Sequence, residues 1–442
     1  MDSKFSRFFS ATLISRVFGY LRDLCIAHFV GGGALADIYF ASFRLANLLR
    51  GLVGEGGLYA AYTPVYSPIL AKDKYDAGRF AYAYIARLAL VLAVAIGLGI
   101  EFAGPLTRLL LWGFTDDPQK IALAARLTAI LLPFLLFITL AAWAQATIQA
   151  GGKFFWSGLS PIFLSAAIII YLLLSSINRY GPSSSLIIGL AWATTAGGFL
   201  QFAALIPQLI PSVGYPTIPK MTRSHPQLKG SFVLFLPYVF TFGFDQINAL
   251  VGTFFGSFAE SGTIAALYNS SRLIQLPLGL IGVGSLVTAL PDLSRQASAG
   301  DSSQISGLIR NQMKRVLTFQ LPILAFFLLF APFIIRLLYF HGEFSWAAFH
   351  LTQKLLRITA PSLLFFSLQK VYLSLFYAHQ DTKSLIWASF AQLAANILIC
   401  AVAVRFWGAA GIGLAATVSS LLGLAIMSYL AKKKQWLASW LP

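Results

Sequence analysis

The chain has 442 residues, of which 58% are hydrophobic and 11% are charged, and its mean hydropathy is +0.75. Because soluble globular domains carry about 25% charged residues, this composition excludes an ordinary soluble protein. The apolar runs are long and continuous, which argues against a transmembrane β-barrel and predicts an all-α polytopic membrane protein. The net charge of +17 is explained by Lys and Arg in cytoplasmic loops rather than by nucleic-acid binding.

Hydropathy predicts about twelve transmembrane helices. In chain order, we expect them at residues 8–30, 35–66, 80–104, 121–150, 155–175, 184–210, 230–258, 262–290, 314–339, 350–378, 383–405 and 409–431. Lys and Arg are concentrated in alternate loops, which predicts that both termini are cytoplasmic. No cleavable signal peptide is expected, because charged residues interrupt the first apolar run. Cys25 and Cys400 lie in separate apolar stretches, so we interpret them as packing residues.

The first predicted helix contains charged residues at depths where lipid penalises them. A charge at the bilayer centre costs at least about 2.5–3.5 kcal/mol, so such residues usually face a protein interior or a wet cavity. Arg16 and Asp23 are seven residues apart and share one helix face. They are therefore candidates for a cavity lining, or for an ion pair that only fixes helix packing.

The second predicted helix carries a polar stripe formed by Asp37, Arg44 and Glu55. Arg22 and Arg50 lie off the stripes of their helices and are alternatively explained as side chains that extend to lipid headgroups. The glycines beside Arg50 favour either close helix packing or a bend. Since the basic residues outnumber the acidic ones, a shared cavity would suit an anionic substrate such as a phosphate, which arginine binds bidentately.

The chain repeats itself at an offset of 228 residues. At this offset "FRLANLLRGLVGEGGL" (43–58) meets "SRLIQLPLGLIGVGSL" (271–286), Arg44 meets Arg272, and Arg108 meets Arg336. Two lobes of six helices are therefore predicted, at residues 1–225 and 226–442, related by an axis along the membrane normal. Transporters of this kind bind substrate between the halves and alternate their access, although duplication without transport is the other interpretation.

Polar residues also occur in the later helices. These residues are Asp245, Gln392, Asn396 and Thr417. Their oxygens are candidates for a sodium site, and interhelical hydrogen bonding is the alternative. No nucleotide-binding or zinc-binding motif appears, so direct use of ATP and metalloenzyme chemistry are not indicated, and no cofactor other than Na⁺ is expected.

Four stretches resemble the lipid II flippase family MurJ, of the multidrug/oligosaccharidyl-lipid/polysaccharide exporter superfamily. They are "ISRVFGYLRD" (14–23), "ADIYFASFRLANLLRGLVGEGGLYAAYTP" (36–64), "SSRLIQLPLGLIGVGSLVTALPDLS" (270–294) and "YFHGEFSW" (339–346). The resemblance covers essentially the whole chain. It implies two six-helix lobes and a transporter, not an enzyme, that moves undecaprenyl-pyrophosphate-linked peptidoglycan precursor from the inner to the outer leaflet of the bacterial cytoplasmic membrane by alternating access.

The resemblance also implies roles for the charged residues. Arg16, Arg22 and Arg272 would hold the pyrophosphate, with Arg44 and Arg50 as further substrate-binding positions. Asp23, Asp37 and Glu55 would pair with arginines when the cavity is empty or closing. Sodium coupling through Asp245, Asn396, Thr417 and Gln392 is a further expectation. The expected partners are the lipid-linked precursor, the membrane and the cell-wall synthesis machinery, with a monomeric protein.

Three other functions compete with this one. A flippase for another polyprenyl-linked glycan shares the same chemistry. A drug exporter of the superfamily would use acidic or aromatic residues for cations, and a membrane enzyme on lipid-linked sugars would need paired acidic residues at a membrane face. The sequence also departs from the family, because Ser271 stands where an acidic residue often precedes the second-lobe arginine. The family's two further helices, which would form a groove for the lipid tail, do not follow "KKKQWLASWLP".

Overall fold

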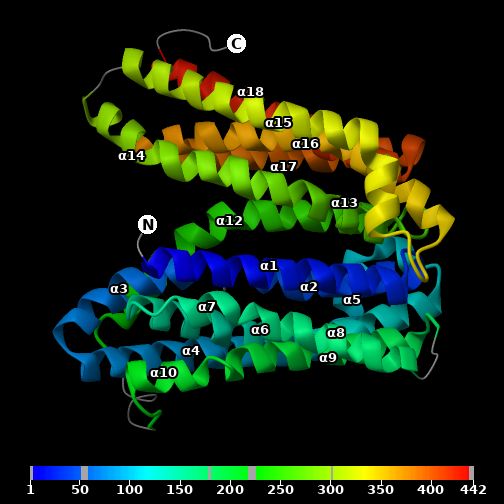
Figure 1. Ribbon diagram of the computed structural model, residues 1–442, viewed down its shortest axis with the longest axis horizontal. Coiled ribbons are helices and arrows are strands. Elements are labelled where there is room, and N and C mark those ends of the chain that lie inside the picture. The colour runs from blue at the N-terminus through cyan, green and yellow to red at the C-terminus, as the bar shows by residue number, and fades with distance from the viewer. Residues whose placement is uncertain (1–2, 51–57, 178–180, 218–224, 300–301, 438–442) are drawn as a thin grey trace. The chain divides into compact units, whose positions relative to one another are not determined.

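The computed structural model describes residues 3–50, 58–177, 181–217, 225–299 and 302–437, and the regular elements in these ranges are all helices (Figure 1). The elements of the first half are α1 (Ser3–Val30), α2 (Ala34–Arg50), α3 (Leu58–Lys72), α4 (Lys74–Glu101), α5 (Ala103–Leu110), η2 (Trp112–Phe114), α6 (Pro118–Ala150), α7 (Phe155–Leu159), α8 (Pro161–Ile177), α9 (Ser184–Ala203) and α10 (Ile206–Val213). Those of the second half are α12 (Leu228–Gly256), α13 (Thr263–Pro277), η3 (Leu278–Gly282), α14 (Val283–Ala299), α15 (Ser302–Leu338), α16 (Trp346–Ala378), α17 (Thr382–Trp407) and α18 (Ala409–Lys433).

Nine stretches of the described chain are long and apolar enough to cross a membrane. They are Lys74–Glu101, Pro118–Ala150, Phe155–Ile177, Ser184–Val213, Thr263–Ala299, Ser302–Leu338, Trp346–Ala378, Thr382–Trp407 and Ala409–Lys433. Three of the twelve predicted helices, at 8–30, 35–66 and 230–258, are not among them. The first contains Arg16, Arg22 and Asp23, and α2 has only 17 residues. The multi-pass, all-α architecture is confirmed.

The predicted helix at 35–66 corresponds to two helices in the structure. The first, α2, ends at Arg50, and the second, α3, begins at Leu58. Residues 51–57, which include Glu55 and four glycines, lie outside the described residues. The predicted helix at 262–290 likewise contains α13, the π-helical turn η3 and α14.

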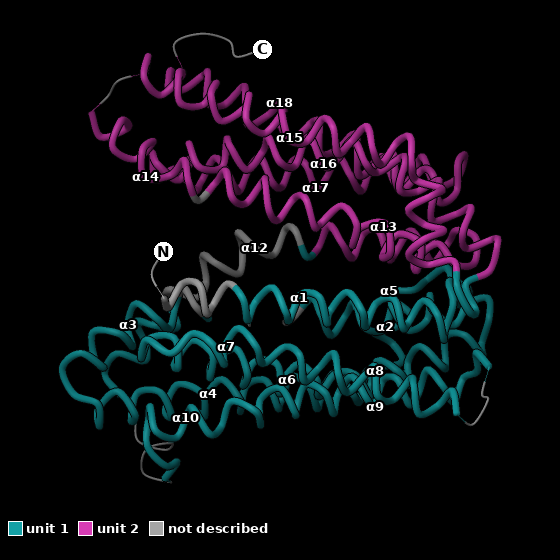
Figure 2. The backbone as a smooth tube through the Cα atoms, viewed as in Figure 1, with its two compact units in different colours: residues 1–246, 341–344 teal, residues 247–340, 345–442 magenta. Residues whose placement is uncertain are grey.

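Two compact units divide the chain (Figure 2). Unit 1 comprises Met1–Gln246 with His341–Phe344, and unit 2 comprises Ile247–Phe340 with Ser345–Pro442. The first turn of α12 belongs to the core of unit 1, where Leu228 is buried and Ser231 Oγ donates a hydrogen bond to Ala61 O over 2.7 Å. The division into lobes of residues 1–225 and 226–442 stays a prediction.

In unit 1, α6 packs against α2, α3, α4 and α9. Two side-chain hydrogen bonds join α2 to α6 and α9. Ser42 Oγ donates to Ala124 O on α6 over 3.1 Å, and the hydroxyls of Tyr39 and Thr194, on α9, lie 2.9 Å apart. A Cβ at Gly198 would lie 2.7 Å from the ring of Phe134, so α9 and α6 approach as closely as a small residue allows. These contacts position α2 and its charged residues.

In unit 2, α16 packs against α13, α14, α15 and α18. Pro277 ends α13, and because proline lacks an N–H and disturbs the regular bonding pattern, the π-helical η3 follows directly. Gln320 on α15 supports this irregular segment. Its amide donates to Pro277 O over 3.4 Å and to Ser367 Oγ on α16 over 2.7 Å. The end of α13 is therefore tied to two neighbouring helices.

A short turn from the second half of the sequence belongs to unit 1. Glu343 N donates to His28 O, at the end of α1, over 2.9 Å. Two glycines with positive φ meet at this contact, Gly31 at +81° and Gly342 at +59°. A Cβ at Gly342 would lie 2.4 Å from His28 O, and one at Gly31 would lie 2.5 Å from Glu343 O. The two turns therefore pack backbone against backbone.

Candidate functional site

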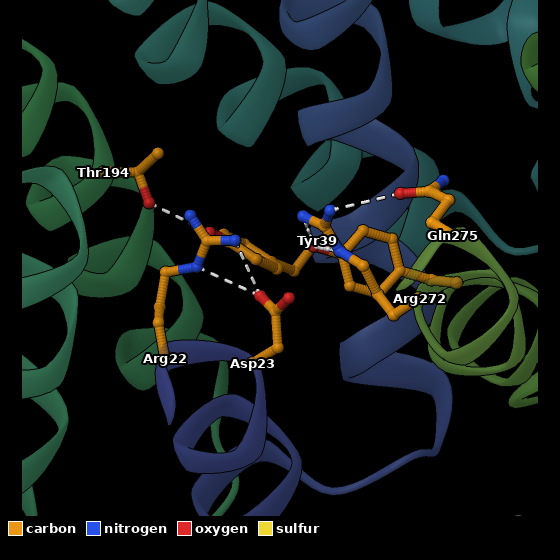
Figure 3. A network of polar contacts seen from close by, with 7 residues as sticks. Arg22, Asp23, Tyr39, Thr194, Arg272 and Gln275 are labelled. Atoms are coloured by element: carbon orange, nitrogen blue, oxygen red, sulfur yellow. Dashed lines mark hydrogen bonds and ion pairs between the residues drawn. The ribbon is translucent and has the colours of Figure 1, made fainter. Parts of the chain in front are cut away.

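Arg22 and Asp23 form a buried ion pair on α1 (Figure 3). Arg22 Nε and Nη2 both donate to Asp23 Oδ1, over 3.0 and 2.8 Å. Only 9% of Arg22 and 3% of Asp23 is exposed. An isolated buried charge is very costly, and this pair places two opposite charges in contact. The apolar run of α1 thus carries a guanidinium whose charge is balanced by its sequence neighbour.

Arg16, the other predicted arginine of α1, is exposed. The interpretation of Arg16 and Asp23 as an ion pair is wrong, since the described ion pair of Asp23 runs to Arg22. The physical reason is distance along the helix. Seven residues rise by about 10.5 Å, whereas adjacent residues are separated by about 1.5 Å, and the long Arg22 side chain can fold back onto its neighbour.

On α2, the predicted polar stripe is only partly described. Asp37 lies in the first turn and is 3% exposed, a position where a negative charge interacts favourably with the helix dipole. Arg44 is half-buried. The side chain of Arg50 and the whole of Glu55 lie outside the described residues. The roles of these four residues stay predictions.

In unit 2, Arg272 lies half-buried on α13 (Figure 3). Its Nε and Nη2 donate to the hydroxyl of Tyr268 over 3.1 and 2.8 Å, and its Nη1 donates to Gln275 Oε1 over 3.4 Å. The guanidinium carbon lies 5.0 Å from the Tyr268 ring centroid, within the range of a cation–π interaction. Ser271, at the position where the family often has an acid, donates instead to Tyr268 O over 2.8 Å.

The side chains of the predicted sodium site take part in helix packing. Asn396 Nδ2 donates to Asn248 Oδ1 over 2.6 Å, and Thr417 Oγ1 donates to Ile358 O over 2.8 Å. Gln392 is buried against Gly423, where an added Cβ would lie 2.0 Å from Gln392 Oε1. The side chain of Asp245 lies outside the described residues.

These contacts favour interhelical hydrogen bonding over metal binding. Asn396 Nδ2 and the Thr417 hydroxyl donate to oxygens of neighbouring helices, which is the usual role of polar side chains between membrane helices. Among the described residues, no group of three or more His, Cys, Asp or Glu could hold a metal ion. The sodium site at Asp245, Asn396, Thr417 and Gln392 stays a prediction.

The two cysteines, Cys25 and Cys400, are free. Cys400 is buried next to Asn396, with Sγ 3.7 Å from Asn396 Oδ1, and Cys25 is half-buried.

Sequence patterns did not single out several polar residues near the predicted ones. Tyr39 and Thr194 fix α2 to α9, and Tyr268 and Gln275 flank Arg272. Tyr268 and Gln275 could have been identified in the sequence, because they lie four and three positions from Arg272 and therefore on its helix face. Basic residues within α4 and α16 were also missed, although they are charges in apolar runs like the others; these are Arg87, Lys354, Arg357 and Lys370.

Comparison with known proteins identifies the family. The sequence model described as "Lipid II flippase MurJ" matches residues 26–441. A "Probable lipid II flippase MurJ" of Vibrio cholerae is 31% identical over 424 residues, which cover 94% of this chain and 80% of that protein. The protein of the same description from Rhizobium tropici is 32% identical over 424 residues, which cover 95% of this chain and 78% of that protein.

Solved structures agree with the sequence matches. The structure titled "Lipid II flippase MurJ, inward closed conformation" has a TM-score of 0.81 and 26% identity, and the match covers 97% of this chain and 88% of that one. An inward-facing multidrug transporter of the MATE family has a TM-score of 0.78 at 14% identity, with 97% of each chain covered, and therefore shares the fold alone. With matches along nearly its whole length, and with buried or half-buried arginines in both units, the chain belongs to the MurJ family of lipid II flippases.

Proposed function

We propose that this chain moves lipid II, the undecaprenyl-pyrophosphate-linked peptidoglycan precursor, from the inner to the outer leaflet of the bacterial cytoplasmic membrane by alternating access. The family is one of multi-pass membrane transporters and not of enzymes. The observation that carries the proposal is the presence of ordered guanidinium groups inside apolar helices, Arg22 in unit 1 and Arg272 in unit 2. A pyrophosphate is the part of lipid II that such groups recognise best.

Arg22 binds one phosphate of the headgroup in this account. Its Nε and Nη2 donate to Asp23 Oδ1. A pyrophosphate carries more negative charge than a carboxylate and offers more acceptor oxygens, so it competes for the same donors. When the substrate leaves, Asp23 again neutralises the buried guanidinium. The carboxylate thereby lowers the free energy of the empty state and prevents a bare charge in the membrane.

Arg272 provides a second contact to the pyrophosphate. Its guanidinium donates to the Tyr268 hydroxyl and to the Gln275 amide oxygen. Arg16, which is exposed on α1, is the third proposed pyrophosphate ligand. Arg44 and Arg50 are proposed as further substrate contacts, and Asp37 and Glu55, like Asp23, as residues that pair with arginines when no substrate is bound.

Orientation and energy coupling follow from charge. Both termini are proposed to be cytoplasmic, because Lys and Arg are concentrated in the loops on that side. Movement of one net charge across the membrane is coupled to the potential by about 2.3 kcal/mol per 100 mV. A negative interior would therefore favour the return of a positively charged empty protein to the inward state. A monomer that works with the cell-wall synthesis machinery is the proposed functional form.

Depletion of the protein in its native host tests this function. The expected result is accumulation of lipid II in the inner leaflet, detected by its loss from an outer-leaflet assay while total lipid II rises. A flippase for another polyprenyl-linked glycan would instead cause that other lipid to accumulate, with lipid II normally distributed. That second outcome would overturn lipid II as the substrate, although the chain would still be a transporter of this family.

A further inference from the structure

Arg272 donates hydrogen bonds to two residues of its own helix, Tyr268 and Gln275, of which Figure 3 labels Gln275. Tyr268 lies four residues before it and Gln275 three residues after it, so both side chains lie on the same face of α13. The Tyr268 hydroxyl accepts from Nε and Nη2, and Gln275 Oε1 accepts from Nη1. Three guanidinium nitrogens on two edges of the group are thus engaged, which restricts its orientation.

The tyrosine is a rigid support for this arrangement. Only 8% of Tyr268 is exposed, and α13 packs against α16. The other end of α13 is tied down as well, since Gln320 binds Pro277 O and Ser367 Oγ. A buried ring on an anchored helix therefore carries a half-buried arginine. Without such support, a long arginine side chain samples many rotamers, and ordering it costs free energy when a ligand binds.

The tyrosine contributes in two separable ways. Its ring lies 5.0 Å from the guanidinium carbon and attracts the cation through the π face. Its hydroxyl accepts two hydrogen bonds at 2.8 and 3.1 Å and sets the direction of the Arg272 donors. Substitution by phenylalanine retains the ring and removes only the hydroxyl, so the two contributions can be measured apart.

We propose that Tyr268 is a positioning residue for substrate recognition, whose hydroxyl orients the Arg272 guanidinium toward the pyrophosphate. The inference rests on the proposed function and adds a residue to the site. Because the hydroxyl acts through Arg272, its contribution disappears when Arg272 is absent. A residue that only stabilises the fold would contribute equally with and without Arg272.

The experiment is a double-mutant cycle on the purified full-length protein, with lipid II affinity as the readout. The variants are Tyr268→Phe, Arg272→Ala and the two combined. Tyr372→Phe is the matched control, because it removes a tyrosine hydroxyl of unit 2 that lies 3.0 Å from Ser428 Oγ, on a different pair of helices. Thermal midpoints of all variants are measured in parallel, so that a loss of fold is recognised.

We expect Tyr268→Phe to weaken lipid II binding by about three- to tenfold, which is the effect of one ordinary hydrogen bond. Arg272→Ala weakens it further, and the double variant binds like Arg272→Ala. Equal affinities of the Tyr268→Phe and Tyr372→Phe variants would overturn the inference, as would additive losses in the double variant. Unchanged binding by Arg272→Ala would instead overturn the assignment of Arg272 in the proposed function, and the inference with it.

Discussion

Arg22 places two of its N–H groups on a single oxygen of its neighbour Asp23, in a part of α1 where both residues are almost completely buried. Each charge depends on the other for its stability, because neither is well exposed to water. The pair therefore has consequences for folding that are separate from its proposed role in transport.

Loss of Asp23 alone should strongly destabilise the protein. Asp23→Ala removes the carboxylate that accepts from Arg22 Nε and Nη2, for which we expect a loss of about 3–5 kcal/mol, whereas Arg22→Ala/Asp23→Ala should be milder than Asp23→Ala. Thermal unfolding in detergent measures both. Asp292→Ala is the control, because its carboxylate pairs with Arg295 at an exposed site. A double variant less stable than Asp23→Ala would contradict this account.

The close packing of the turns at Gly31 and Gly342 predicts that one added methyl group lowers the stability of the protein. Gly342→Ala introduces a Cβ 2.4 Å from His28 O at a φ of +59°. We expect a loss of about 1–3 kcal/mol and faster hydrogen exchange at the Glu343 amide, which donates to His28 O. Gly152→Ala is the control, since its φ of +77° is also positive but no atom lies within 4 Å of the added Cβ. Equal effects of the two substitutions would show that the close approach is unimportant.

Asn396 donates a hydrogen bond to Asn248, so we predict that its contribution to the stability of the protein is the same with and without sodium. Asn396→Ala should reduce stability by about 0.6–1.7 kcal/mol, the range for polar contacts between membrane helices. The measurement is thermal unfolding of both proteins in NaCl and in KCl. We expect the same difference in the two salts. A stabilisation by Na⁺ that Asn396→Ala abolishes would instead support the sodium site.

Asp381, at the start of α17, predicts a weak dependence of stability on pH. Burial raises the pKa of Asp381, but hydrogen bonds from Lys434 and Ser384 outweigh it and leave the pKa below its ordinary value. A lowered pKa in the folded state stabilises the protein above the unfolded pKa of about 3.9, and this contribution is lost as the pH falls through the folded pKa.

The test is Asp381→Asn, which keeps an acceptor for the Ser384 amide and removes the charge that pairs with Lys434. We expect it to cost about 0.2–1 kcal/mol at neutral pH and nothing once the pH is well below 4. Asp117→Asn is a control at the exposed N-cap of α6, where the carboxylate accepts from backbone amides. If the difference in the free energy of unfolding between the wild type and Asp381→Asn were independent of pH, the ion pair with Lys434 would not contribute to stability.

Much of the fold follows from patterns that are local in sequence. Runs of about 20 apolar residues predict the long helices, because a bilayer requires that length. The match of Arg44 with Arg272 at a fixed offset predicts a duplicated helix from the sequence alone. The turn at 341–344 could not be predicted in the same way. Its contact with His28 joins residues more than 300 positions apart, and no local pattern records it.

The sequence identified the charged residues of the candidate site, but it did not predict which of them contact each other. An ideal helical wheel groups Asp23 with Arg16 and separates it from Arg22, because adjacent residues point about 100° apart. The structure pairs Asp23 with Arg22 instead, since an arginine side chain is long enough to turn back on its neighbour. Tyr268 and Gln275 carry no charge and so do not stand out in an apolar helix, although their spacing from Arg272 is regular.

The central claim is that Arg22 and Arg272 bind the pyrophosphate of lipid II during transport. The most direct measurement is the rate of lipid II translocation in proteoliposomes that contain correctly inserted Arg22→Ala or Arg272→Ala protein. Arg405→Ala is the matched control, since this arginine is exposed in the last turn of α17. We predict that Arg22→Ala and Arg272→Ala each lose at least about tenfold in rate, the effect of removing a charge-assisted contact of about 1.4 kcal/mol or more, while the control stays normal. Normal translocation by both Arg22→Ala and Arg272→Ala would contradict the account.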